Sequence, residues 1–332
     1  MKRNWIFLSI LSVGLILSGI ALGWGSWGHK HINRAAVFSL PDEMRPFYYN
    51  HIDYITESSV VPDLRRPLLN DKQEGPRHYI DIEEFNGLAI ADFPKTTKEA
   101  YEKFGDSLIN RAGSLPWYIQ SMMYKLIRAF KAGNKSEILF LSGEIAHYIG
   151  DAHVPLHTTS NHNGQLTGQI GIHSLWESTL PPMFGGSFNF KTDKPNYISD
   201  IADYTWKIIA HTYSLVDTVL AADKKIRSAF DTTAMYKRDS LGNRVMFYNN
   251  PVYSDAYASA FQKELGDMVE KQLRMAIYNT SCYWYTAWVI AGRPDLSKLD
   301  DPELTKRNRD NFKKEYKAWQ EGKILYLTED KE

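Results

Sequence analysis

The sequence predicts a single, mainly α-helical domain. Most of the chain carries apolar residues at the spacing of a helix face, strand signals are confined to two short stretches, and no repeat or low-complexity linker interrupts it. With 332 residues, 43% of them hydrophobic, the chain can bury a sizeable core. Because 39 basic and 39 acidic residues balance, no global basic field is available to hold a nucleic-acid duplex.

The first 23 residues have the three parts of a secretory signal peptide. Residues 2–3 are basic, residues 5–20 form an apolar run, and the small residues of 21–23 resemble a cleavage site. The alternative is an uncleaved membrane anchor, although a run of about 16 residues is short for a span. We expect cleavage before Trp24, which would give a secreted or periplasmic protein without a transmembrane span.

Five segments of the remaining chain predict helices. The first, 29–41, has apolar residues near helical spacing and stops at its proline. The second, 114–134, carries an apolar stripe and ends at a Gly-Asn pair, and the third, 135–155, follows directly and also stops at a proline. Further along, 197–226 reads as one long helix, and 254–291 as one or two more.

The remaining segments are short or charged. Residues 187–191 and 244–248 predict a small hairpin or extended loops. The tail, 296–332, is rich in charge and contains an amphipathic pattern between Asp301 and Gln320. We expect a solvated cap or a partly disordered end there, without a functional role.

Cysteine usage points to a stabilising element other than disulfides. Cys282 is the only cysteine of the chain, so no disulfide framework is available. A secreted domain of this size needs another stabilising element, and bound metal ions are a natural candidate.

The densest group of candidate metal ligands is the stretch "HYIGDAHVPLH". His147 and Asp151 are four residues apart and share one face of a helix, and His157 follows just beyond the helix end. His173 and Glu177 repeat this spacing in "GIHSLWES". An imidazole and a carboxylate on one helical face suit zinc, which binds compact N and O donors. Two such pairs, joined by a loop with a further histidine, indicate a metal site far more strongly than one.

More candidates lie upstream, in contexts that resemble loops. "VVPDLRR" offers Asp63, "PRHYID" offers His78 with Asp81 three residues on, and His29 begins the first predicted helix. Each also has an ordinary interpretation: Asp63 suits a turn or a helix cap, and His78 a hydrogen-bonded, partly buried imidazole. Together, however, these histidines and carboxylates exceed the roughly four ligands that one zinc ion needs, which favours a cluster.

Five motifs in order carry a family resemblance: W-x4-H, P-D-x-x-R, H-Y-I-D, H-x3-D-x5-H and H-x3-E. This set resembles the zinc-dependent single-strand nucleases of fungi and plants, and is similar to the related bacterial zinc-dependent phospholipases C. The match runs from Trp24 to Glu177, and 254–291 resembles the closing helices of the family. The resemblance implies an all-α phosphodiesterase domain over 24–295, with three zinc ions at the bottom of a cleft.

The resemblance also implies the ligands, position by position. One zinc would take Asp63, His78, His147 and Asp151; a second would take His157, His173 and Glu177; the third would take Trp24, His29 and Asp151. Trp24 would bind through its amino nitrogen and carbonyl oxygen after the leader is removed, with its ring packed against the core. Asp151 would bridge two of the ions.

The reaction implied by the family is phosphodiester hydrolysis. A water held between two zinc ions would attack phosphorus in line, while the third ion stabilises the leaving oxygen. Asp63 would also orient that water. Arg66 would face the charge that builds on the phosphoryl oxygens, although the adjacent Arg65 could serve instead.

The substrate depends on which branch of the family the chain follows. Tyr79 and Asp81 match positions where the nucleases stack a base and hydrogen-bond it, although core packing and a loop cap would equally explain them. Two features resemble the phospholipases: Glu177, and the short loop between His157 and His173. The sequence "NGQ" in place of the nucleases' G-G-N departs from the nucleases. We expect a nuclease acting on single-stranded nucleic acid or nucleotides. A phospholipase C acting on phospholipid and a non-catalytic zinc protein are the alternatives, and no protein partner is implied.

Overall fold

The computed structural model describes residues 24–247 and 250–327. The predicted signal peptide, over 1–23, lies outside the described residues. The α-helices of the described part are α1 (Gly25–Ser39), α2 (Arg45–Asn50), α3 (Ile52–Ser58), α4 (Val61–Leu69), α5 (Thr97–Ala112), α6 (Leu115–Ala132), α7 (Lys135–Asp151), α8 (Ile172–Ser174), α9 (Leu180–Phe184), α10 (Ile201–Tyr213), α11 (Val216–Ala229), α12 (Asp255–Leu265), α13 (Met268–Ile290) and α14 (Pro302–Gln320). The all-α prediction is confirmed.

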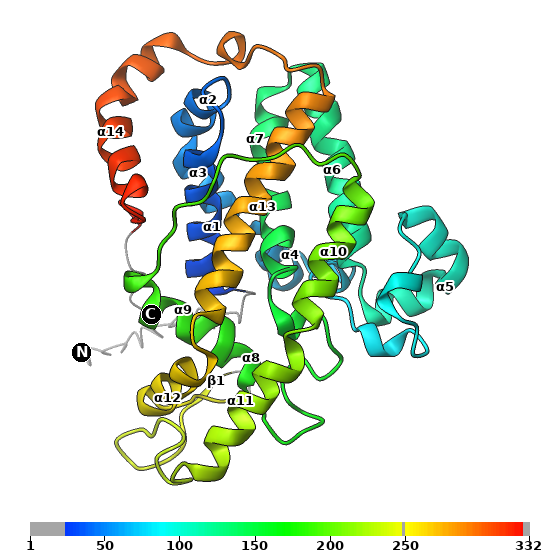
Figure 1. The fold of residues 1–332 in the computed structure, drawn as a ribbon, viewed down its shortest axis with the longest axis vertical. Helices are drawn as coiled ribbons and strands as arrows, with labels where there is room; N and C mark the ends of the chain where they lie inside the picture. Colours follow the sequence, from blue (N-terminus) through cyan, green and yellow to red (C-terminus); the bar gives the residue numbers. More distant parts are fainter. Residues whose placement is uncertain (1–23, 248–249, 328–332) are drawn as a thin grey trace, which may run out of the picture.

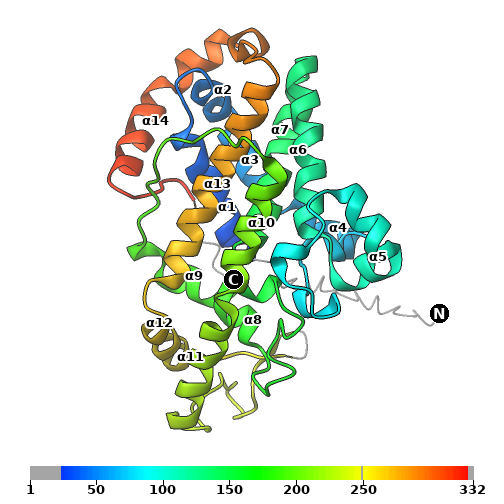
Figure 2. The ribbon, with the colours of Figure 1, turned by 45° about the vertical axis from the view of Figure 1, so that its right-hand side comes forward.

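Helices α1, α3, α6, α7 and α13 pack together as the centre of the fold (Figure 1). The indole of Trp284, in α13, donates a hydrogen bond to the Ser142 carbonyl of α7 at 3.0 Å and stacks on Tyr48 of α2 with ring centroids 4.9 Å apart. All three side chains are buried. Helices α1 and α7 pack against each other, and the candidate ligands lie near the start of α1 (His29) and in the last turns of α7 (His147 and Asp151). Figure 2 shows these central helices from a second side.

Helices α6 and α7 form where their sequences favour a helix. α7 begins at an Asn134 cap, whose side chain accepts a hydrogen bond from the Glu137 backbone, and it buries apolar residues all along its length. α6 ends at Gly133, which adopts the left-handed conformation that favours glycine. The segments 114–134 and 135–155 are therefore helical as predicted, each losing its last residues to turns.

Two expectations about elements were wrong, and one about His78 was right. The segment 197–226 is not one helix, because α10 ends at Tyr213 and α11 begins at Val216. Ser214 and Leu215 form the turn between them, where the Leu215 backbone N–H donates to the Thr212 carbonyl at 3.1 Å. Asp63 is not in a loop but in the first turn of α4, where a proline at the helix start is well tolerated. His78 lies in a bend, as the loop-like context predicted, directly after a short 3-10 helix, η1 (Gly75–Arg77).

The strand signals are only partly reflected in the structure. β1 (Met246–Phe247) pairs antiparallel with β2 (Asn250–Pro251), as a hairpin in the second predicted region requires. Residues 187–191 form no ladder with another described strand. They begin at the end of a 3-10 turn, η6 (Gly185–Ser187). Phe190 donates its backbone N–H to the Gly322 carbonyl at 2.9 Å.

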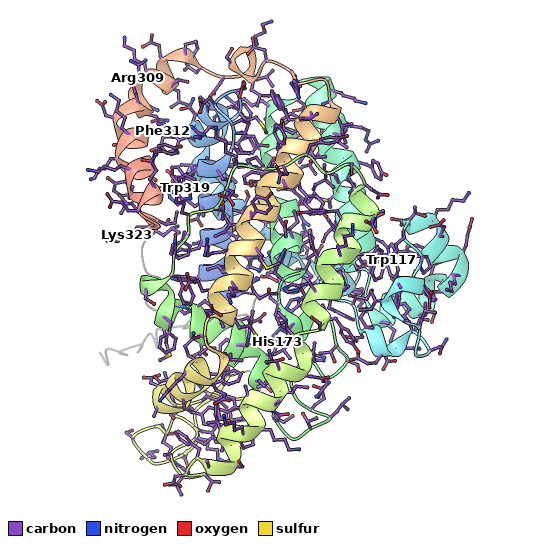
Figure 3. All side chains as sticks on the ribbon, viewed as in Figure 1. Trp117, His173, Arg309, Phe312, Trp319 and Lys323 are labelled. Atoms are coloured by element: carbon purple, nitrogen blue, oxygen red, sulfur yellow. The ribbon has the colours of Figure 1, made fainter. Side chains whose placement is uncertain are left out.

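The tail after residue 295 packs on the domain as a helical cap. α14 starts at the Asp301 cap and matches the amphipathic pattern predicted between Asp301 and Gln320. Figure 3 shows Trp319 on the side of α14 that faces α1 and α2, and its ring stacks near Phe38. The buried Glu315 carboxylate accepts hydrogen bonds from Arg34 and Tyr49, each at 2.7 Å. Within the described residues, none of the helices has the length and apolar character that a membrane crossing needs.

Candidate metal centre

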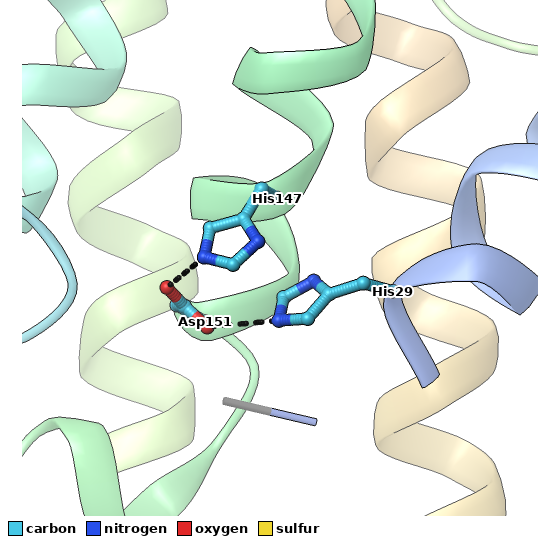
Figure 4. A group of neighbouring side chains, drawn as sticks. All are labelled: His29, His147 and Asp151. Atoms are coloured by element: carbon cyan, nitrogen blue, oxygen red, sulfur yellow. Dashed lines mark ion pairs between the residues drawn. The ribbon is translucent and has the colours of Figure 1, made fainter. Parts of the chain in front are cut away.

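The C-terminal turn of α7 brings His147 and Asp151 onto one face, as their spacing predicts. Nε2 of His147 lies 3.2 Å from a carboxylate oxygen of Asp151, and both side chains are buried. His29, near the start of α1, stacks on His147 with ring centroids 3.8 Å apart. Its Nε2 lies 3.4 Å from the other Asp151 oxygen, so the three side chains converge from two helices (Figure 4).

His78 contacts the same carboxylate, and Asp63 lies beside His78 and His147. Nδ1 of His78 lies 2.9 Å from Asp151 and 3.7 Å from Asp63, and Nε2 of His147 lies 3.6 Å from Asp63. Asp63, His78 and His147 can therefore surround one metal ion. His29, His147 and Asp151 form a second such group, so His147 belongs to both.

A third group lies beyond the end of α7. His157, in the 3-10 turn η4 (Pro155–His157), places its Nε2 3.2 Å from Glu177. His173, in α8, places its Nε2 3.0 Å from the same carboxylate oxygen. Glu177 sits in a π-helical turn, η5 (Leu175–Thr179), so the i,i+4 pair persists although the helix around it is irregular.

The second ring nitrogen of two of these histidines is engaged by a backbone carbonyl. Nδ1 of His147 pairs with the Ser59 carbonyl at 2.7 Å, and Nδ1 of His157 pairs with the His78 carbonyl at 2.6 Å. Such hydrogen bonds fix the ring orientation and leave the opposite nitrogen as the ligand atom. The bond from His157 to His78 also ties the third group to the first.

The donor set fits zinc. Oδ2 of Asp63 is buried and has no hydrogen-bond partner within the described residues. Nε2 of His29 and Oδ1 of Asp151, and Nε2 of His173 and Glu177, lie close together without the geometry of a full hydrogen bond. Leaving buried polar atoms unsatisfied is costly, and a cation among them would satisfy them. Imidazole nitrogens and carboxylate oxygens are the zinc donors that this chain, with its single cysteine, has available.

The electrostatics of the groups also favour a cation. Burial alone would lower the pKa of His78, but its hydrogen bonds to Asp151 and Glu74 outweigh burial and raise that pKa to about 10. Burial would likewise lower the pKa of His157, but the charge of Asp151 and the hydrogen bond to Glu177 raise it to about 9. Without a metal the carboxylates hold protons on these rings, and zinc would replace those protons.

Trp24 lies at the edge of the third group. Its ring is buried, packs against Trp176 with centroids 5.0 Å apart, and donates from Nε1 to the Gly150 carbonyl at 2.7 Å. Gly28 makes room for this ring, since a Cβ there would lie 2.8 Å from the Trp24 Cβ. The Trp24 backbone nitrogen donates to Glu177 at 3.2 Å, which places it beside a different group from the one that the resemblance implies.

Arg65, which precedes the Arg66 of the D-x-x-R motif, is engaged by neighbouring side chains. Arg65 forms ion pairs with Glu144 and with Glu74, and its guanidinium lies over the Phe140 ring. These contacts tie Arg65 to α7. The side chain of Arg66 lies outside the described part of the structure.

Tyr79 and Asp81 lie on the stretch that follows His78 and runs beside the third group. The Ile80 backbone N–H donates to the His157 carbonyl at 2.8 Å, which holds this stretch in place. Tyr79 is half-buried, and its hydroxyl donates to the Arg111 carbonyl at 3.2 Å. Burial and the charges of Glu83 and Glu84 raise the pKa of the half-buried Asp81 carboxyl to about 7.

Sequence reasoning missed Glu74 and passed over His162. Glu74 is buried behind His78, four residues before it, and the E-x3-H spacing was the available signal. His162 lies beside His173 with ring centroids 6.1 Å apart. His162 belongs to the loop between His157 and His173, where the sequence has no helical spacing that would single it out.

Comparisons with known proteins identify the family. The family model described as zinc-dependent phospholipase C matches residues 28–238, a span that holds every predicted ligand except Trp24. Nuclease S1 of Aspergillus oryzae (strain ATCC 42149 / RIB 40) is 20% identical over 312 residues, which cover 86% of this chain and 98% of that protein. The resemblance predicted from the motifs is confirmed, and the chain belongs to the zinc-dependent phospholipase C family.

Proposed function

We propose that this chain is a secreted or periplasmic zinc-dependent phosphodiester hydrolase, and that its substrates are single-stranded nucleic acids or nucleotides. The observation that carries the hydrolase assignment is the convergence of three groups of imidazoles and carboxylates around the buried Asp151. In the proposed site, three zinc ions are held by Trp24, His29, Asp63, His78, His147, Asp151, His157, His173 and Glu177. Removal of residues 1–23 supplies the free amine of Trp24.

Zinc in such a site acts as a Lewis acid and makes water nucleophilic near neutral pH. The chain's own residues orient the reactants. Oδ2 of Asp63 is buried without a hydrogen-bond partner among the described residues, so it can accept a hydrogen bond from the attacking water. Arg66 follows Asp63 by three residues in α4, and residues three apart share one side of a helix. Since Arg65 is engaged with Glu144, we assign contact with the phosphoryl oxygens to Arg66.

The nuclease assignment rests on the stretch His78–Asp81 and on the similarity to nuclease S1. Tyr79 is half-buried and directly follows the proposed ligand His78 in the chain, so we assign to it the base-stacking role that the resemblance implies. Asp81, beside it, supplies a carboxyl group for hydrogen bonds to base edges. Phospholipase C activity is the second candidate, favoured by the family model and by Glu177 at the position where the nucleases have Asp.

A substrate panel tests the assignment. The chain that begins at Trp24 is purified and given single-stranded DNA, RNA and phosphatidylcholine, each with and without a zinc chelator. We expect cleavage of the nucleic acids, loss of cleavage with chelator, and recovery when zinc is restored. Cleavage of phosphatidylcholine alone would identify a phospholipase C, and no cleavage of any substrate between about pH 5 and pH 8 would refute the hydrolase proposal.

Replacing Tyr79 with Ala tests the base-stacking role. Stacking is worth about 1–3 kcal/mol per base, so KM for single-stranded DNA should rise about 5- to 150-fold. Turnover of bis-p-nitrophenyl phosphate, which has no base, should fall far less. Tyr124→Ala is the matched control, because Tyr124 lies on α6 with its side chain 61% exposed. An equal loss on both substrates would contradict a base-specific role for Tyr79.

A further inference from the structure

Glu74 is a fully buried carboxylate that faces a candidate zinc ligand from behind. Its side chain has 0% exposure, and Oε1 lies 3.3 Å from Nε2 of His78. The hydroxyl of Tyr148, the residue after His147 in α7, donates to the same oxygen. Arg77 donates to the other oxygen at 2.7 Å, and Arg65 approaches it at 3.5 Å.

The two nitrogens of His78 face opposite partners. Nδ1 points to Asp63, His147 and Asp151, which are the atoms that would share its metal ion. Nε2 points to Glu74. An imidazole that carries its proton on Nε2 donates that proton to the carboxylate and presents the Nδ1 lone pair to the metal, so Glu74 selects the tautomer that binds.

Glu74 differs from the acceptors behind the neighbouring ligands. The outer nitrogens of His147 and His157 contact backbone carbonyls, which are neutral, whereas His78 contacts a charged group. A charged acceptor makes the imidazole more basic and holds its ring in one orientation. Burying a lone carboxylate is costly, and the hydrogen bonds from Tyr148 and Arg77 compensate for that cost.

We propose that Glu74 is a positioning residue of the zinc centre, which orients His78 and strengthens its bond to the metal. This inference rests on the proposed ligand set. The alternative is that Glu74 only neutralises Arg65 and Arg77, which would make it structural and leave metal binding unaffected.

The test measures zinc affinity rather than activity. The chain beginning at Trp24 is stripped of metal and titrated with zinc against a chromogenic chelator, as wild type, Glu74→Gln and Glu144→Gln. Glu144 is the matched control, because it is also buried and pairs with Arg65, one of the cations near Glu74. We expect Glu74→Gln to weaken the binding of one ion by about 10- to 100-fold and Glu144→Gln to change it by less than about 3-fold.

Equal affinity of Glu74→Gln and wild type, or an equal loss in both variants, would overturn the proposal. A wild-type chain that binds fewer than two zinc ions would instead refute the metal centre of the proposed function. To separate metal binding from any effect of Glu74→Gln on folding, the tautomer of His78 is also measured in the zinc-loaded wild-type chain by ¹⁵N NMR, with assignment from His78→Asn. A proton on Nε2 supports the proposal, and a proton on Nδ1 overturns it.

Discussion

Replacing Asp151 with Asn is expected to remove at least one zinc ion and to slow phosphodiester hydrolysis by at least about 10³-fold. The Asp151 carboxylate lies 2.9 Å from His78, 3.2 Å from His147 and 3.4 Å from His29. In the proposed site it bridges two ions, and Asn keeps its volume but loses its charge. The amide would leave the ions facing one another without the anion that separates them.

The Asp151→Asn variant needs a control for the loss of a buried carboxylate. Asp223→Asn serves, because Asp223 is equally buried and is held by Tyr257, Arg227 and Gln169. Elemental analysis counts zinc per chain, and initial rates on single-stranded DNA give the activity of each variant. Asp223→Asn should keep the zinc content of the wild type even if its unfolding temperature falls. Wild-type zinc content and activity in Asp151→Asn would contradict the bridging role.

A chain that retains one residue before Trp24 is expected to bind one zinc ion fewer and to lose about 10²-fold in activity. When a residue precedes Trp24, its nitrogen belongs to a peptide bond, which donates a hydrogen bond but offers no lone pair to a metal. In the full chain this nitrogen donates to Glu177 at 3.2 Å. A free α-amine has a pKa of about 8, and zinc displaces its proton readily.

One preparation can provide both states of the N-terminus. A cleavable extension is placed before Trp24 so that a specific protease leaves Trp24 as the first residue. Zinc content and cleavage of single-stranded DNA are measured before and after the cut, and mass spectrometry verifies the new terminus. The same extension placed after residue 332 controls for the protease and the tag. Equal zinc content before and after the N-terminal cut would contradict the role of the amine.

Local patterns predicted much of the fold and of the candidate site. The helices around α6 and α7 follow from apolar periodicity and from a glycine and an asparagine at their ends. The pairs His147–Asp151 and His173–Glu177 follow from i,i+4 spacing, which holds even where the second helix is irregular. The break at Ser214 was missed, because the turn of two residues between α10 and α11 leaves no trace in the apolar period.

Other features depend on contacts between distant segments. The tail could be recognised as amphipathic, but only the structure shows Glu315 of α14 buried against Arg34 of α1. Likewise, the D-x-x-R spacing favours Arg66 but leaves the adjacent Arg65 as an alternative, and only the structure shows that Arg65 pairs with Glu144 on another helix. Glu74 became recognisable only when the fold placed its carboxylate behind His78.

The sequence by itself determined which residue types the candidate centre has and how they pair within each short segment, because a helical turn fixes the positions of residues three or four apart. Only the tertiary structure decided how the segments meet. It placed Asp151 among histidines from α1, α7 and the stretch after α4, gave His147 to two groups, and set the Trp24 nitrogen beside Glu177. These contacts between distant segments result from the packing of buried helix faces. The local spacing of residues does not specify which faces pack together.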